Sequence, residues 1–343
     1  MRKTIVAMAT MSIVLVAGPA WACGGLVAPN GAVRLVRTTT LAAYHEGVEH
    51  YVTSFRFGVA DGEFGSIVPL PAVPTKIEAG GRWTLQRLQE EFAPPVPLAV
   101  DGEALAAAPA EVLIEKQVGA LDITVLKGGA AEVVAWASEH GFDLSPDTEE
   151  VLSFYATRSP IFMAARYDAA RAARRGLTEG DGTAIHLTIP THNPWVPLHI
   201  LGLAKPADEV VEADIFLLSD EAPAILPEPR RGEVGDPGLV LVSQEEASDG
   251  LLADLRSDRG MDWLPASGMT LTYLSLAEKA GNLTFDLGLD AHGNAPSLTD
   301  VGVRPVPEFP TPGDWTPAIA LGLIGMLVLA AMAERRAARR VRA

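Results

Sequence analysis

The sequence predicts an α+β fold: a body of mainly antiparallel β-sheet with a helical insert, followed by one C-terminal transmembrane helix. Strand signals open and close the body, and residues 50–59 alternate with the period of a half-buried strand. Two helical segments stand together between these strand signals, which favours α+β over a parallel βαβ sheet. An uncharged apolar stretch near the C-terminus ends in a cluster of arginines, the pattern of a membrane span and its stop signal.

Three strands are predicted in the first third of the body. Residues 32–43 are rich in Val, Leu and Thr, and residues 50–59 carry Tyr, Thr, Phe and Phe at every second position, which places these four side chains on one face. Residues 64–70 form a third strand that contains Pro69. Because proline has no backbone N–H, we expect the pairing to end there or the strand to lie at a sheet edge.

The middle of the body combines helices and strands. A helix is predicted over residues 82–92, with apolar side chains on one face, and residues 93–109 after it read as a Pro- and Ala-rich loop. Two strands and then two helices follow, at residues 111–117, 121–127, 130–140 and 146–157. Gly141 stops the first of these helices, and Ser145 is the expected cap of the second.

The last part of the body returns to strands. They are predicted at residues 161–167, 183–190, 196–204, 210–218, 240–242, 269–276 and 283–289. One helix is predicted among them, over residues 244–256. If the body of residues 23–294 holds two subdomains, we place their boundary near residues 170–182, where the chain carries turn residues.

The N-terminus has the form of a secretory signal peptide over residues 1–22. A basic start and an apolar stretch lead to small residues at Ala20 and Ala22, so we expect cleavage after Ala22 and a mature chain that begins at Cys23. Lipidation of Cys23 remains open, because bacterial lipoproteins are cut before a cysteine, although the bulky Trp21 fits that pattern poorly. An uncleaved N-terminal anchor is the third alternative.

Cys23 is the single cysteine of the chain. The body therefore has no internal disulfide available in an oxidising compartment. Since 48% of the residues are hydrophobic, we expect a packed core to stabilise it instead.

The C-terminus predicts a membrane anchor. Residues 295–314 form a Pro-rich linker, and the apolar residues 315–333 are just long enough for a transmembrane helix. The tail of residues 334–343 should stay in the cytoplasm because arginine resists translocation, which leaves the body outside. Its arginines are Arg335, Arg336, Arg339, Arg340 and Arg342. Two alternatives remain: a sorting signal that is removed after export, and a buried core helix.

The body carries a strong negative charge. The whole chain has a formal net charge of −16, and residues 23–333 carry about −22 once the basic ends are set aside. Such a charge disfavours binding of the body to nucleic acid or to anionic lipid. The predicted partners are the membrane, through the C-terminal helix, and a protein of unknown kind in the envelope.

Three stretches carry a resemblance to a known family: residues 22–25 (ACGG), residues 64–74 (FGSIVPLPAVP), and residues 118–168 with Trp136 and Tyr155. Together they resemble the domain of unknown function 2330, a family of exported bacterial proteins, over roughly residues 22–220. The resemblance implies export, and it brings no catalytic or binding residues. The extra cysteines frequent in the family are missing here, so no shared disulfide or redox role is implied.

The histidines are the first candidates for a metal site, and they fall into two groups: His186, His192 and His199 in one segment, and His45 and His50 around a predicted turn. If a loop gathered the first group with Asp181, zinc or copper could bind there. The spacings across prolines are not a metal signature, however. We therefore expect structural histidines and no metal ligands in either group.

Catalytic signatures are also missing from the sequence. Ser267 precedes a glycine as in a turn and has no strand–Ser–helix elbow around it. The Gly80–Gly81 and Gly128–Gly129 pairs read as turns and not as a phosphate loop. Paired glutamates lie in predicted helices, where adjacent side chains diverge by about 100°; they are Glu90–Glu91, Glu149–Glu150 and Glu245–Glu246. We predict no catalytic residue and no cofactor.

The sequence thus indicates an uncharacterised membrane-anchored extracytoplasmic protein of the bacterial envelope. We expect a non-enzymatic binding or structural module on a single-pass anchor, with its C-terminus in the cytoplasm. Two alternatives stay open. One is an extracytoplasmic hydrolase with an unrecognised carboxylate or metal site. The other is an accessory subunit of a membrane complex, where Gly322 and Gly325 offer a small-residue helix contact.

Overall fold

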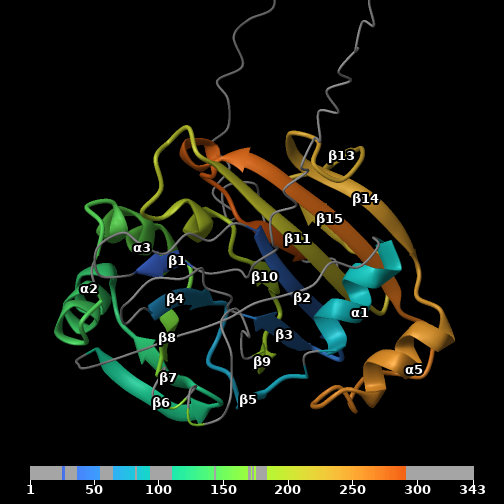
Figure 1. Ribbon diagram of the computed structural model, residues 1–343, viewed down its shortest axis with the longest axis horizontal. Helices are drawn as coiled ribbons and strands as arrows, with labels where there is room; N and C mark the ends of the chain where they lie inside the picture. Colours follow the sequence, from blue (N-terminus) through green and yellow to red (C-terminus); the bar gives the residue numbers. More distant parts are fainter. Residues whose placement is uncertain are drawn as a thin grey trace, which may run out of the picture. The chain divides into compact units, whose positions relative to one another are not determined.

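The computed structural model describes residues 25–27, 37–54, 65–81, 83–92, 110–142, 144–168, 171, 174 and 184–290. The chain divides into two compact units, Met1–Val303 and Arg304–Ala343, and all described residues lie in the first. They form mostly antiparallel and mixed β-sheet with four α-helices, which is an α+β arrangement (Figure 1). The predicted fold class of the body is confirmed at this level.

The largest sheet has eight strands in the order β13-β14-β15-β11-β2-β3-β9-β5. In that order the strands span Arg230–Arg231, Gly238–Glu246, Thr270–Lys279, Val210–Ser219, Arg37–His45, Val48–Ser54, Ala184–Pro190 and Lys76–Ala79. Most neighbours are antiparallel, but β11 pairs with β2 in parallel and β13 pairs with β14 in parallel. The sheet therefore joins strands from both ends of the described chain.

A second sheet has five strands, all antiparallel, in the order β1-β4-β8-β7-β6. These strands span Gly25–Val27, Gly65–Leu70, Ile161–Tyr167, Leu121–Lys127 and Glu111–Val118. Strand β1 pairs with Gly65, Ser66 and Ile67 only, so among the described residues Pro69 has a partner strand on one side alone, β8. This local edge accommodates the missing N–H of Pro69, as the sequence predicts.

A small third sheet joins β10 (Trp195–Val196), β16 (Leu287–Asp290) and β12 (Ala224–Leu226). The chain also forms two short 3-10 helices. One is η2 (His199–Gly202), which precedes β11 of the large sheet, and the other is η3 (Ala280–Asn282), which precedes β16. Strand β16 lies between the other two and pairs antiparallel with each.

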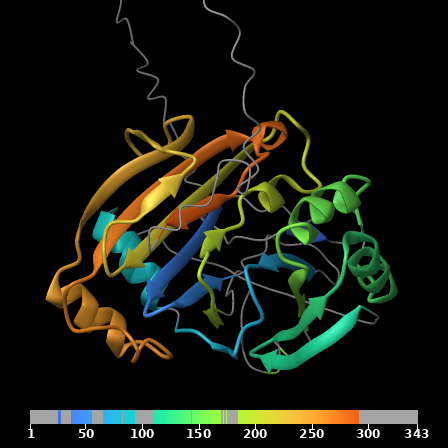
Figure 2. The same ribbon diagram turned by 180° about the vertical axis from the view of Figure 1, so that it is seen from behind.

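The four α-helices cover different sheets (Figures 1 and 2). Helices α1 (Trp83–Phe92) and α5 (Asp249–Ser257) pack on one face of the eight-stranded sheet through leucines such as Leu88 and Leu252, both fully buried. Helices α2 (Ala130–Glu139) and α3 (Thr148–Ala156) pack in the larger core cluster, which includes the five-stranded sheet and the opposite face of the large sheet.

One predicted strand, residues 196–204, is wrong. The chain forms only the two-residue β10 there and then turns into η2. Pro197 ends the strand because it lacks a ladder donor. The buried Asp286 carboxylate accepts the backbone N–H groups of Leu198 and His199, which starts the 3-10 turn. An apolar run alone did not distinguish these outcomes.

The predicted helix over residues 244–256 begins too early. Residues Gln244, Glu245 and Glu246 extend β14 and pair with β15. Ser248 then caps α5, since its Oγ accepts the Leu251 N–H at 3.1 Å. A serine with this capping role marks the true start of the helix.

Several other predicted elements match closely, whereas the strand predicted over residues 283–289 begins only at Leu287. The predictions for residues 121–127 and 161–167 coincide with β7 and β8, and β6, β11 and β15 lie within a few residues of their predicted ranges. Strand β14 is much longer than the predicted residues 240–242. The second helix of the insert starts at Thr148, after Asp147 and not after Ser145.

Both chain ends lie outside the described residues. This applies to the predicted signal peptide, the Pro-rich linker, the transmembrane helix and the basic tail. Within the part that the structure describes, every helix is too short or too polar to cross a membrane.

Candidate functional site

Two buried histidines from neighbouring strands meet on one face of the eight-stranded sheet. In the antiparallel pairing of β3 with β9, His50 lies opposite Thr188 and His186 lies opposite Val52, so the two histidines hold diagonal positions on one face. Glu78 of β5 lies directly opposite His186 and joins them. His50 is 8% exposed and His186 is 1% exposed.

The three side chains form an ordered row. His50 Nδ1 lies 2.9 Å from His186 Nε2, and His186 Nδ1 lies 3.6 Å from Glu78 Oε1. Both distances fit favourable contacts when the Nδ1–H of His186 faces the Glu78 carboxylate and the Nε2 of His186 accepts a hydrogen bond from the Nδ1–H of His50. The opposite tautomer would direct a nitrogen lone pair at the carboxylate. Glu78 therefore sets the direction of the hydrogen bond between the rings.

A loop covers this row. Residues 258–264, the cover loop, follow α5, and Trp263 stacks on His50 with 3.5 Å between ring centroids and 9° between planes. Gly260 has a φ of +80°, and a Cβ there would lie 3.2 Å from His186 Nδ1. Glycine thus serves both the left-handed backbone and the close approach to the histidine.

The cover loop is fastened to α1. Asp258 Oδ2 accepts hydrogen bonds from the Thr84 backbone N–H at 2.6 Å and from Thr84 Oγ1 at 2.7 Å. Gly81 donates its backbone N–H to the Arg259 carbonyl at 3.1 Å. Met261 and Leu264 are buried in the cluster formed by α1, α5 and the sheet. The carboxylate also suits the positive N-terminus of α1.

Burial keeps both histidines neutral. Burial, assisted by the nearby His186, His45 and Lys76, lowers the pKa of His50 to about 3. Burial also lowers the pKa of His186 to about 4, against the opposing effect of Glu78. A general base works best when its pKa lies near the working pH. The pair therefore suits a structural contact better than proton transfer at neutral pH.

The structure regroups the histidines that the sequence suggested. His186 contacts His50 of the other group. His192 is exposed, and His199 begins η2 with its ring against Phe154 at a centroid distance of 4.4 Å. His45 Nδ1 lies 2.6 Å from Asp220 Oδ1.

Asp181, the carboxylate considered with the first histidine group, lies outside the described residues. Within the described part of the chain, no three His, Cys, Asp or Glu side chains gather as a metal ion requires. The expectation that the protein uses no metal or cofactor stays a prediction.

A second buried polar cluster centres on Asp286, which is fully buried. Its Oδ1 accepts hydrogen bonds from Tyr155 Oη at 2.7 Å, from the Leu198 N–H at 2.8 Å and from the His199 N–H at 3.1 Å. Tyr155 Oη in turn accepts the Ile200 N–H at 2.9 Å. The cluster joins α3, η2 and the segment before β16.

Burial shifts both acids of this cluster upward. It raises the pKa of Asp286 to about 6, although the hydrogen bonds from Tyr155 and the two backbone N–H groups oppose the shift. Burial and the neighbouring carboxylate raise the pKa of Tyr155 well above 10. Asp286 is thus mostly ionised at pH 7 at a cost in desolvation.

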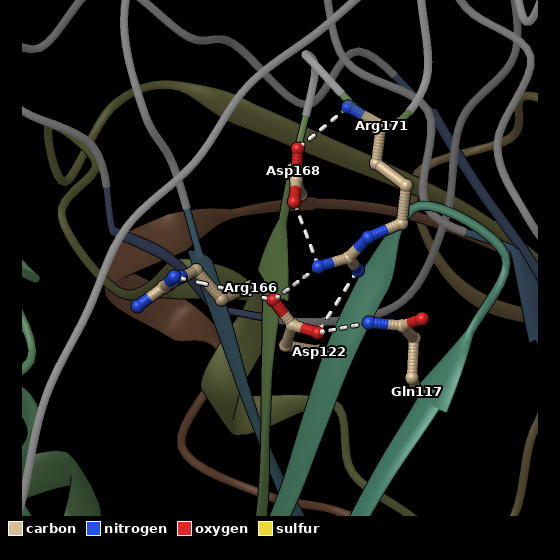
Figure 3. A network of polar contacts seen from close by, with 5 residues as sticks. All are labelled: Gln117, Asp122, Arg166, Asp168 and Arg171. Atoms are coloured by element: carbon tan, nitrogen blue, oxygen red, sulfur yellow. Dashed lines mark hydrogen bonds and ion pairs between the residues drawn. The ribbon is translucent and has the colours of Figure 1, made fainter. Parts of the chain in front are cut away.

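An arginine network lies at the end of the five-stranded sheet (Figure 3). Arg171 Nη1 and Nη2 contact the two oxygens of Asp122 at 2.9 Å and 3.0 Å, and Nη2 also lies 2.7 Å from Asp168 Oδ2. Gln117 donates to Asp122 at 3.2 Å, and Arg166 lies 4.0 Å from the same carboxylate. The two-pronged pair ties Arg171, beyond the end of β8, to β7.

The other residues singled out in the sequence form no site in the described part of the chain. Gly268, after Ser267, has a φ of +79°, in keeping with a turn, and Gly129 precedes α2 as its N-cap. Glu245 and Glu246 lie in a strand and not in the predicted helix. The residues predicted for signal processing and membrane orientation lie outside the described residues: Ala20, Ala22, Cys23, Arg335, Arg336, Arg339, Arg340 and Arg342.

Structures of baculovirus P35 are among the solved structures that are similar to the chain. One, of baculovirus P35, shares 8% identity with a TM-score of 0.39, covering 77% of this chain and 99% of that one. The other, of a mutated baculovirus P35 after caspase cleavage, shares 7% identity with a TM-score of 0.36, covering 74% and 99%. These scores are too low for an inference about function. No curated protein matches the chain.

A family model matches residues 17–221, which is more than half of the chain. The match includes β3, β9 and β5, and therefore all three members of the His50–His186–Glu78 row, but not the cover loop. It agrees with the stretches that carry the resemblance seen in the sequence. The protein accordingly belongs to the DUF2330 family, described as uncharacterized proteins conserved in bacteria.

Proposed function

We propose that the protein is a membrane-anchored extracytoplasmic module of the bacterial envelope that acts by binding or as a structural element, without catalysis. The observation that carries the non-catalytic part is the enclosure of four side chains whose pKa is strongly shifted. His50, His186, Tyr155 and Asp286 are each 8% exposed or less. Each lies within hydrogen-bond distance of another side chain of the same chain. The side chains that most resemble catalytic residues therefore serve to hold loops in place.

The chain ends support the location. A basic start, an apolar stretch and two small residues precede Cys23, and an uncharged stretch precedes five arginines at the C-terminus. These patterns are typical of export and of a helix that stops in the membrane with its tail inside.

The location is tested with an epitope tag after Ala343. Protease added to intact spheroplasts should digest the body and leave the tag protected until the membrane is opened. Cytoplasmic and extracytoplasmic marker proteins serve as controls. A tag that is digested in intact cells contradicts the orientation, and a tag that is missing from the mature protein contradicts a permanent anchor.

The non-catalytic part is tested on the purified full-length chain with ester, phosphoester, peptide and glycoside substrates. We expect no turnover above a matched preparation that carries Asp286→Asn and His186→Gln. If the original chain turns over one of these substrates and the folded double variant does not, the proposal is overturned in favour of a hydrolase.

A further inference from the structure

We propose that the cover loop is a pH-sensitive switch, which opens when the His50–His186 pair takes up protons and closes again near neutral pH. His50 Nδ1 lies 2.9 Å from His186 Nε2, and the ring of Trp263 stacks on His50 with 3.5 Å between the ring centroids. With the loop closed, a charge on His186 would sit in a site that is 1% exposed. A buried cation without water is costly, so proton uptake favours the open loop.

The contact tolerates one proton but not two. A first proton fits best on His186, whose Nδ1 lies 3.6 Å from Glu78 Oε1, because one hydrogen can still be shared between the rings. A second proton, on His50, gives both ring nitrogens at the 2.9 Å contact a hydrogen. Two donors cannot hydrogen-bond to each other, and two imidazolium cations repel. The switch therefore responds to two protons.

The charged groups around the pair come from three elements. Lys76 of β5 and His45 of β2 oppose protonation, whereas Glu78 of β5 and Asp262 of the cover loop favour it. Lys76 Nζ lies 2.6 Å from Glu78 Oε1, so the carboxylate nearest to His186 is already shared with a cation. The Glu78 carboxylate therefore cannot fully compensate a new positive charge on His186. Contact with water, which requires the loop to open, is the other way to stabilise that charge.

The cover loop is the element that can yield. The histidines themselves are held by β3 and β9, which pair along all seven residues of each strand. Trp263 covers His50, but its indole Nε1 is buried without a hydrogen-bond partner among the described residues, which weakens the closed state. Gly260 and Gly268, both at positive φ, allow the backbone to move within the loop and just after it.

The coupling between proton uptake and loop opening predicts in which direction, and how steeply, loop opening depends on pH. Because the closed loop holds both histidines at a lowered pKa, closure is complete above pH 6.5 and is lost as the pH falls below it. Two protons give up to about a hundredfold increase in the opening constant per pH unit.

The test is hydrogen–deuterium exchange of the full-length chain in detergent at pH 7.5, 6 and 5, corrected for intrinsic exchange rates. We expect amides of residues 260–264 to exchange at least tenfold faster at pH 5 than at pH 7.5, while amides of β7 and α2 keep their protection. Unchanged exchange in the loop overturns the proposal. So does loss of protection throughout the body at the same pH, because that is global unfolding.

Variants identify the proton sites. The double variant His50→Gln with His186→Gln keeps a hydrogen bond between the strands but does not titrate, so it should lose the pH response. His140→Gln is the control, because the half-buried His140 also stacks on a tryptophan, with 3.7 Å between its ring centroid and that of Trp136, but lies at the C-terminal end of α2. It should leave the response intact. If the double variant does not fold, His50→Gln alone should reduce the steepness to about tenfold per pH unit; an unaltered slope in it overturns the proposal.

Discussion

Two buried polar clusters hold segments of this chain in place, and they do so with opposite chemistry. The row of His50 and His186 supports the cover loop with bases, and burial lowers the pKa of both. The cluster of Tyr155 and Asp286 holds η2 with acids, and burial raises the pKa of both. In each case burial favours the neutral form.

The same physical cause therefore gives opposite responses to pH. A base with a lowered pKa loses its contribution to stability in acid, whereas an acid with a raised pKa loses it as the pH rises. The comparison predicts that the cover loop is the acid-sensitive region and that η2 is held most firmly in mild acid. Substitutions at Asp286, at the histidine pair and at Asp258 test this contrast.

Replacing Asp286 with alanine should have the largest effect on stability. Asp286→Ala removes the acceptor of three hydrogen bonds and leaves the Tyr155 hydroxyl and two backbone N–H groups buried without it. We expect a loss of about 3 kcal/mol in the free energy of unfolding, measured by chemical denaturation of the full-length chain. A loss below about 1 kcal/mol would show that water replaces the carboxylate.

The acid limb of stability should depend on the histidine pair. The folded pKa values of about 3 and 4 lie below the 6.5 of an unfolded histidine. The contribution of the pair to stability is therefore full above pH 6.5 and should fall by up to about 1.4 kcal/mol per histidine for each pH unit below it, until the cover loop opens. Denaturation at pH 7, 6 and 5 measures this. The His50→Gln, His186→Gln double variant should show a flatter curve, and equal slopes would contradict the assignment.

The contribution of Asp286 to stability should change with pH in the opposite direction, and Asp286→Asn tests this. The folded pKa of Asp286, about 6, lies above its ordinary 3.8, so its contribution is present below pH 3.8 and is lost as the pH rises through 6. Asparagine keeps an acceptor oxygen and does not titrate. The cost of the substitution should fall by about 2 kcal/mol between pH 4.5 and 7.5. A cost that is independent of pH would show that the carboxyl has an ordinary pKa in the fold.

Much of the fold could be predicted from local pattern. Strands β7 and β8 coincide with their predicted ranges, because β7 alternates between buried and half-buried residues along most of its length and β8 is a short, mostly apolar run that is almost entirely buried. The parallel pairing of β11 with β2 could not be predicted, because it depends on contacts between segments far apart in the sequence. The short strands β5 and β12 cannot be predicted either, since three or four residues carry too little periodicity.

The two buried clusters could be predicted only in part. His50 and His186 were both noted as candidates but in separate groups, because their contact arises from the register of β3 against β9. The role of Asp286 cannot be predicted, because a single aspartate in an apolar segment gives no signal of its burial. The buried Tyr155–Asp286 bond joins residues of different elements, and no spacing in the sequence indicates it.

The smallest expected effect separates the fastening of the cover loop from its proton response. Asp258 accepts two hydrogen bonds from Thr84 at the start of α1, and loss of such a cap costs about 1 kcal/mol. Asp258→Ala should therefore lower stability by about that amount at pH 7 and leave the slope below pH 6.5 unchanged, because Asp258 is not among the groups that shift the histidines. Asp254→Ala is the matched control: its exposed pair with Arg87 should contribute less than about 0.5 kcal/mol. If Asp258→Ala instead alters the slope, then the fastening and the histidine pair act as one unit, and the loop cannot open without releasing α1.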